Sequence, residues 1–150
     1  MPRIARIVAP GIPRHVTQRG NRRMETFFRN EDYQAYLALM AEWCRKGNVT
    51  VWACCRMPNH VHPLAVPESE EGLRLGIGEA HRRYSRMANR PQKWTGHLWE
   101  GRFSSFPMDE SSVLAAVKYI GMNPGTGTSC CRTFSVGTGR KGSRQDSQPW

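Results

Sequence analysis

The sequence lacks any long hydrophobic run. Across its 150 residues no apolar stretch approaches the roughly 18 residues that a membrane span requires. The segment from Met1 to Ala9 contains arginines but no hydrophobic core of a secretory signal. These absences predict a cytoplasmic protein with no membrane partner.

Acidic residues are scarce. Asp and Glu total 12 against 22 Lys and Arg, which gives a formal net charge of +10. Six arginines precede the first acidic residue, Glu25, and a second basic group spans 74–93. Either group alone could equally be solvated surface, but two groups in one small domain favour a phosphate-binding surface. Nucleic acid is therefore the first predicted partner.

Cysteine supports neither a disulfide framework nor a zinc site. The 5 cysteines are odd in number, include two adjacent pairs and have no Cys-x-x-Cys spacing. Reduced thiols in a cytoplasm fit this usage. The chain has no visible internal repeat and is long enough to form one domain with a buried core unaided by disulfides.

The hydrophobic periods predict the order β-α-β-β-α-β-α. This is the α+β, ferredoxin-like split β-α-β sheet with an added C-terminal helix. The expected elements are a strand at 15–18, a helix capped by Asn30 with a stop at 47–48, a hairpin of 49–56 with 60–66, a helix from about 70, a loop at 91–96, a strand at 102–106 and a helix from after 109 to 124. Tyr33 and Tyr36 are expected to be core residues of the first helix, and Met87 is expected in the apolar stripe of the second.

Two histidines, His60 and His62, lie in the segment Met57-Pro58-Asn59-His60-Val61-His62. Alternate residues of a strand point to the same face, so both imidazoles can hold one metal ion. An isolated His-x-His triplet is more often a pair of ordinary histidines than a metal site. A partner elsewhere in the chain must decide.

Tyr119 is the candidate partner. On the last predicted helix an apolar stripe is formed by Val113, Leu114, Val117 and Ile120. Tyr119 lies roughly 150° from the centre of that stripe, so it is not placed as a core tyrosine. Asn123 follows one turn later and its amide can reach what the phenol reaches. On this helix alone, a surface tyrosine before an Asn-Pro helix stop is the simpler interpretation.

Four segments together resemble the single-tyrosine transposases of the IS200-like type, especially their repeat-associated (REP-associated) branch. The resemblance spans roughly residues 1–124 in the family's order and spacing. It is carried by Pro13-Arg14-His15-Val16-Thr17-Gln18-Arg19-Gly20-Asn21-Arg22, Met57 to His62, Gly96-His97-Leu98-Trp99-Glu100-Gly101-Arg102-Phe103, and Tyr119-Ile120 with Asn123-Pro124.

The resemblance implies a metal-dependent transposase or nickase acting on single-stranded DNA. His60, His62 and Asn123 would bind the metal, and Tyr119 would be the nucleophile that forms a 5′-phosphotyrosine by transesterification at hairpin-type DNA ends. Imidazole ligands alone would also suit zinc, whereas an amide and phosphate oxygens suit Mg2+ or Mn2+, the metals that the family suggests.

The same resemblance assigns the basic residues to DNA. Trp99 could stack on a base or pack in the core, and Asn59 could orient a ligand or simply make a turn. The implied partner is single-stranded or hairpin DNA, with a homodimer left open. The residues expected to contact DNA are Arg19, Arg22, Arg23, Arg82, Arg83, Arg86, His97 and Arg102.

Two substitutions within the motifs argue for a catalytically inactive DNA-binding relic as the alternative. Pro63 follows His62 in a strand expected to be interior, where proline removes a ladder hydrogen bond. Arg56 stands where relatives have an apolar residue, so its charge must find solvent, DNA or a protein partner. A metal hydrolase is a third possibility, but it needs a carboxylate or a third histidine, and Glu68 is the only acidic residue close in sequence.

The largest departure is the tail. After Asn123-Pro124 relatives continue with a Val-Arg-Ala-Gly-like stretch, whereas Gly125-Thr126-Gly127-Thr128 opens a low-complexity segment here. We therefore expect a transposase domain at 1–124 and a disordered or frameshifted tail at 125–150.

The frameshift is tested by the coding DNA. If it occurred, one of the two alternative frames downstream of codon 124 encodes a family-like continuation. Finding none in either frame would contradict it.

Overall fold

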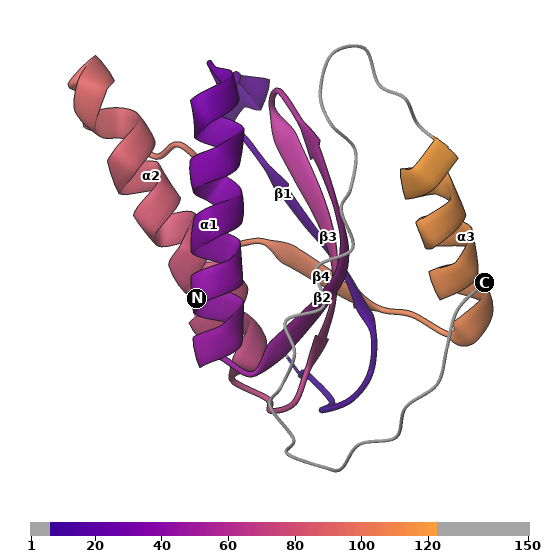
Figure 1. Cartoon of the computed structure of the whole chain (residues 1–150). Helices are drawn as coiled ribbons and strands as arrows, with labels where there is room; N and C mark the ends of the chain where they lie inside the picture. The colour runs from indigo at the N-terminus through magenta and orange to yellow at the C-terminus, as the bar shows by residue number, and fades with distance from the viewer. Residues whose placement is uncertain (1–6, 123–150) are drawn as a thin grey trace, which may run out of the picture.

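A four-stranded antiparallel sheet forms the centre of the computed structural model, which describes residues 7–122 (Figure 1). Its order, β2-β3-β1-β4, is the ferredoxin-like order, and α1 and α2 cover one face while α3 lies on the other. The predicted fold is therefore confirmed. The strands are β1 (Arg14–Arg19), β2 (Val49–Met57), β3 (His60–Pro67) and β4 (Ser104–Pro107), and the helices are α1 (Asn30–Lys46), α2 (Glu79–Gln92) and α3 (Glu110–Met122).

The N-terminus of α1 differs from the prediction by one residue. Arg29, not Asn30, is the N-cap residue. The Asp32 carboxylate accepts hydrogen bonds from the backbone N–H groups of Phe28 and Arg29, at 2.8 and 3.0 Å. A carboxylate at this position satisfies N–H groups that the helix itself leaves without partners, so Asp32 defines where α1 begins.

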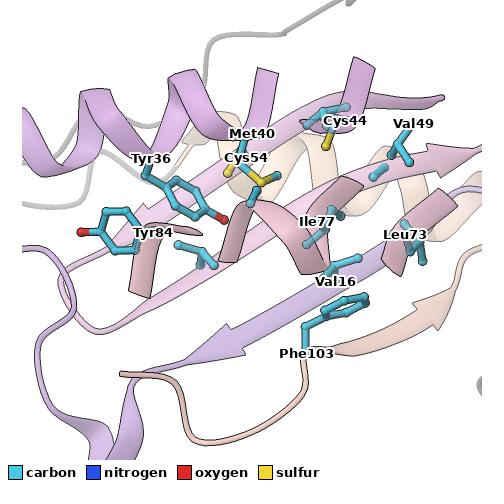
Figure 2. Close-up of a cluster of buried hydrophobic side chains, with 14 of the residues drawn as sticks. Val16, Tyr36, Met40, Cys44, Val49, Cys54, Leu73, Ile77, Tyr84 and Phe103 are labelled. Atoms are coloured by element: carbon cyan, nitrogen blue, oxygen red, sulfur yellow. The ribbon is translucent and has the colours of Figure 1, made fainter. Parts of the chain in front are cut away.

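The main core lies between the sheet and the pair α1 and α2 (Figure 2). Tyr36 is fully buried as expected, whereas Tyr33 is only partly buried at the edge of the core. Tyr84 donates a hydrogen bond from its hydroxyl to the Thr26 carbonyl at 2.7 Å, and the Tyr36 hydroxyl pairs with His81 Nε2 at 2.9 Å. Both buried hydroxyls thus have partners, which burial requires.

The second helical segment is not the single regular helix that the sequence suggested. A π-helical turn, η2 (Arg74–Gly78), precedes α2. A Cβ added at Gly47 would lie 2.7 Å from the Gly76 backbone nitrogen, so the end of α1 approaches this turn more closely than a side chain would allow.

The end of α2 also differs from the sequence prediction. The helix runs through Pro91 to Gln92 and ends at Lys93, whose left-handed φ of +53° closes it. Residues 91 and 92, expected in a loop, are therefore helical. Met87, expected in the apolar stripe, is 38% exposed.

Pro63 lies in the interior strand β3 without disrupting the sheet. The β1–β3 pairs Arg14 with Ala65 and Arg19 with His60 share one register. Pairing between them is interrupted opposite Pro63, which has no N–H to donate. The proline therefore removes a local hydrogen bond but leaves the strand and its register intact.

Only part of the predicted α3 stripe packs against the sheet. Val113 contacts a small cluster that contains Cys55 and Leu64. Leu114 and Val117 are 58% and 44% exposed, so the expectation of a buried stripe is wrong for these two residues. The side chain of Ile120 is outside the described part of the chain, as are Asn123 and residues 124–150. Within the described residues, no helix is long and apolar enough to span a bilayer.

The buried His81 predicts an acid-sensitive fold. Burial lowers the pKa of His81 to about 3, whereas an unfolded histidine titrates near 6.5. As the pH falls below about 6.5 the unfolded chain takes up this proton first, so the stability that the neutral ring contributes is lost between about pH 6.5 and 3. We expect the free energy of unfolding to fall by up to roughly 1.4 kcal/mol per pH unit in that window.

Urea unfolding at several pH values measures this slope. His81→Gln should flatten it, since the amide can still bond to Tyr36 but does not titrate. His97→Gln, at an exposed position, is the matched control. An unchanged slope in His81→Gln would assign the acid sensitivity to other groups.

Candidate metal centre and nucleic-acid interface

His60 and His62 lie on the same face of β3, as the sequence predicted, with ring centroids 4.9 Å apart. We call this side of the sheet the histidine face. The turn before β3 is held by backbone hydrogen bonds from Gly20 N–H to the Asn59 carbonyl, at 2.8 Å, and from Thr26 N–H to the Pro58 carbonyl, at 2.7 Å. The position of His60 is therefore fixed by the segment that follows β1.

Asn59 orients the His60 ring and also belongs to the turn. Its Nδ2 donates to the Arg23 carbonyl at 3.2 Å, and its Oδ1 lies 2.5 Å from His60 Nδ1. Because Oδ1 can only accept, His60 Nδ1 carries the proton and Nε2 presents a lone pair. The two roles that the sequence left open for Asn59 are thus combined in one side chain.

His62 is the more buried of the two imidazoles. Its Nδ1 is buried with no hydrogen-bond partner among the described residues, and its ring stacks on His15 at 5.3 Å. Burial, followed by the charges of His60, His15 and Arg19, lowers the pKa of His62 to about 4. Burial and then Arg19 lower the pKa of His60 as well. Both rings are therefore neutral at pH 7, which is the form that binds a metal.

A cavity of about 350 Å³ opens beside the two histidines. Arg19 and Arg102 make it electropositive, and Glu100 is the one carboxylate that lines it. Sequence reasoning did not single out Glu100 or His15, because neither neighbours the His-x-His segment in the chain. The remaining lining residues are Thr17, Gln18, Gly101 and Ser104.

The described residues alone do not complete a metal site. Within residues 7–122, no three His, Cys, Asp or Glu side chains are grouped closely enough to hold a metal ion. His15 is near His62, but the two rings stack at an interplanar angle of 23° instead of converging on one point. A further ligand must come from a different kind of side chain or from outside this range, where Asn123 lies.

Tyr119 lies on the helix that packs against the histidine face. Val113 of α3 packs against a cluster that contains Cys55, and Cys55 pairs with His62 across the sheet. Tyr119 is 68% exposed, which confirms that it is not a core residue. Its phenol is open to solvent, and α3 lies on the face of the sheet away from α1 and α2 (Figure 1). That face also carries the histidines, since His60 and His62 alternate with the core residue Val61 on β3.

A second hollow, of about 960 Å³, lies between α2 and the segment 96–103. Arg102 and Gln18 line both this groove and the histidine cavity, so the two adjoin. Arg82, Arg86 and His97 also line the groove. Four of the predicted DNA-contacting residues are thus brought together here.

The other predicted contact residues are placed differently. The Arg83 guanidinium lies 4.0 Å from the centre of the Trp43 ring and does not line the groove. Arg22 and Arg23 are exposed in a short turn with left-handed φ values of +53° and +59°. Arg82 is paired with Glu79 at 2.6 Å, which offsets part of its charge.

Two residues that the sequence left undecided are core residues. Trp99 is only 6% exposed, and its Nε1 donates to the His81 carbonyl at 3.2 Å, so it has no free face for a base. Arg56 is equally buried and donates to the Tyr33 carbonyl at 3.2 Å. Its charge therefore has a protein partner on the face opposite the histidines.

One family model and two solved structures are similar to this chain. Residues 11–123 match the family model described as "Transposase IS200 like". A search of curated proteins gave no match. Two solved structures resemble the fold at low sequence identity.

The first of these structures is a REP-associated tyrosine transposase bound to a REP hairpin. It is 20% identical, with a TM-score of 0.59, over 83% of this chain and 73% of that one. The second is a Deinococcus radiodurans R1 protein described as a candidate transposase. It is 17% identical, with a TM-score of 0.55, over 79% of this chain and 95% of that one.

The role of Asn59 predicts a change in the His60 ring. Asn59→Ala removes the acceptor at Nδ1, so we expect His60 to become a mixture of its two neutral tautomers. Imidazole 15N chemical shifts of the metal-free protein measure this. Asn59→Asp keeps an acceptor and should retain the Nδ1–H form; a fixed Nδ1–H tautomer in Asn59→Ala would show that Asn59 does not orient the ring.

Proposed function

Because the chain belongs to the IS200-like transposase family, we propose that it is a metal-dependent enzyme that cleaves and joins single-stranded DNA through a tyrosine nucleophile. One observation carries the proposal: His60 and His62 line an electropositive cavity on the sheet face against which the helix of Tyr119 packs. The proposed activity needs a neutral ligand pair, a cationic phosphate site and an exposed phenol. The histidine pair, the arginines at the cavity and the exposed Tyr119 support the proposal, although Tyr119 itself does not line the cavity.

In the proposed reaction the Tyr119 hydroxyl attacks the phosphorus of a phosphodiester. The bond between phosphorus and the 3′ oxygen of the preceding nucleotide breaks. The phenol loses its proton and the departing 3′ oxygen takes one up. The products are a 5′-phosphotyrosine and a strand with a free 3′-hydroxyl. Since one phosphodiester replaces another, attack by a 3′-hydroxyl on the phosphotyrosine reseals DNA without an energy source.

The two histidines fit a divalent metal. His60 presents Nε2 because Nδ1 is bonded to Asn59, and His62 has a buried nitrogen with no partner within the described residues. Asn123 is the proposed third ligand, through its amide oxygen. Bound Mg2+ or Mn2+ would offset negative charge on the phosphate and so assist attack by a phenol, which is a weak nucleophile at neutral pH.

The adjoining groove gives the DNA strand a path to the cavity. Arg82 and Arg86 line the groove, and Arg102 lies where groove and cavity meet. A single strand that follows these arginines would bring a phosphate to the histidines, where Arg19 also lines the cavity. The neighbour bound to a REP hairpin supports a structured single strand as substrate.

The alternative is a DNA-binding relic without catalytic activity. Pro63 was the main structural reason to favour it, and the intact register of β3 weakens that reason. A metal hydrolase is the other alternative. Glu68 does not line the histidine cavity and His15 is stacked, but Glu100 lines it, so the covalent-capture test must also separate the hydrolase from the tyrosine enzyme.

Covalent capture tests the nucleophile. The full-length protein is mixed with labelled hairpins that carry single-stranded flanks, with Mn2+, Mg2+ or EDTA, and separated on a denaturing gel. We expect a protein–DNA adduct that needs the metal and falls at least 100-fold in Tyr119→Phe, which lacks the attacking oxygen but keeps the ring. Tyr33→Phe, on the opposite face of the sheet, is the matched control and should keep the adduct.

Three results would change the proposal. An adduct that persists in Tyr119→Phe would remove Tyr119 as the nucleophile. The relic would be favoured if the protein binds DNA without forming an adduct and if His62→Ala binds Mn2+ as well as the wild type does. Metal-dependent cleavage that is insensitive to Tyr119→Phe and leaves no adduct would favour the hydrolase.

A further inference from the structure

Trp94 is a large aromatic side chain that the fold leaves open to solvent. It follows the end of α2 and is 42% exposed. Its ring meets that of Phe28, itself 38% exposed, edge to face at a centroid distance of 5.8 Å and an interplanar angle of 76°. The two rings come from segments far apart in the sequence and form one exposed aromatic corner.

The loop that carries Trp94 is held in place by hydrogen bonds. The Trp94 N–H donates to the Asn89 carbonyl at 3.1 Å, and the Asn89 side chain donates to the Gly96 carbonyl at 2.9 Å. Lys93 holds the left-handed φ of +53° that turns the chain out of the helix. The ring is therefore presented in a defined position and loses little freedom on binding a ligand.

The surroundings of the Trp94 ring are cationic on one side. A shallow hollow of about 450 Å³ is lined by Arg86, Arg90 and Lys93 together with Trp94, and no carboxylate lines it. On its other side Trp94 borders a hollow of about 320 Å³ in which Glu25 is the one acidic residue. Arg86 also lines the groove that leads to the histidine cavity, so the corner is continuous with that groove.

We propose that Trp94, supported by Phe28, stacks on an unpaired base of DNA while Arg86, Arg90 and Lys93 contact the flanking phosphates. An aromatic face among cationic side chains is the usual device for holding a single strand, because every base has a stackable face and every linkage a negative charge. The inference rests on the proposed function, which supplies single-stranded DNA as the ligand. It assigns the stacking role to Trp94 and not to the buried Trp99.

The ring's position allows it to recognise the boundary between paired and unpaired DNA. A base-paired duplex keeps its bases stacked on each other, so Trp94 can reach only a base that has left the helix. A hairpin with an unpaired flank offers such a base next to a stem. The corner would then select structured single strands over plain duplex.

Fluorescence anisotropy of labelled DNA tests this with the full-length protein in EDTA, where cleavage is not required. Two probes are compared: a hairpin with an unpaired flank, and a blunt duplex of equal length. Stacking of one base is worth about 1–3 kcal/mol, so Trp94→Ala should raise the Kd for the flanked hairpin roughly 5- to 150-fold. It should leave the Kd for the blunt duplex within about twofold.

Three variants make the assay specific. Trp94→Phe keeps a stacking face and should recover most of the affinity. Trp52→Ala removes a tryptophan of similar exposure, 38%, on β2, and should bind both probes as the wild type does. A flank carrying 2-aminopurine gives a direct readout, since its fluorescence should be quenched by wild type and less by Trp94→Ala.

The stacking site is overturned if Trp94→Ala binds the flanked hairpin like wild type, or if it weakens both probes equally. It is also overturned if Trp52→Ala shows the same loss. The proposed chemistry is tested independently of the stacking site. If no covalent adduct forms but the binding pattern is as expected, Tyr119 is rejected as the nucleophile while the stacking role of Trp94 is retained. A normal adduct with no effect of Trp94→Ala would reject the stacking site alone.

Discussion

The turn that begins β3 is the constraint on which the site depends. Its two carbonyls, on Pro58 and Asn59, accept hydrogen bonds from the segment that follows β1, and the Asn59 side chain bonds to both His60 and the Arg23 carbonyl. One short turn thus connects the end of β1, an arginine-bearing turn and the first histidine. Gly20 permits the tight turn of the segment after β1, because a Cβ there would lie 2.2 Å from the Met24 carbonyl oxygen.

The two faces of the sheet have different roles because side chains alternate between them along each strand. One face packs in the core and the other carries the candidate site. On one face Val16 and Val61 pack beneath α1 and α2 and form the core. On the other face lie His15, His60 and His62, only half-buried and beside a solvent-open cavity. Because alternate residues of a strand point to opposite faces, one strand contributes to both without conflict. The small cluster around Leu64 then needs only the first turn of α3 to cover it.

The surroundings of each arginine are set by its neighbours in the fold and not by its position along the chain. Arg82 and Arg83 are adjacent on α2 and both pair with Glu79, at 2.6 and 3.9 Å, yet Arg82 lines the groove while Arg83 covers Trp43. Arg102, from a distant segment, lies where the groove meets the histidine cavity. Cationic side chains thus occur along one path from Lys93 and Arg90 near Trp94 to Arg19 at the cavity. In the groove between these ends the arginines are accompanied by carboxylates, which are Glu70, Glu71, Glu79 and Glu100.

The sequence by itself determined the order of the elements, the hairpin, the shared face of His60 and His62, and the exposure of Tyr119. These follow from local periods of two and about 3.6 residues and from turn chemistry, which are readable in a few adjacent positions. The tertiary structure alone decided that His15 stacks on His62, that Glu100 borders the cavity, that Trp99 is buried while Trp94 is exposed, and that Arg83 lies away from the groove. Each of these depends on contacts between residues far apart in the chain, and such contacts are set by strand order and helix packing, not by local pattern.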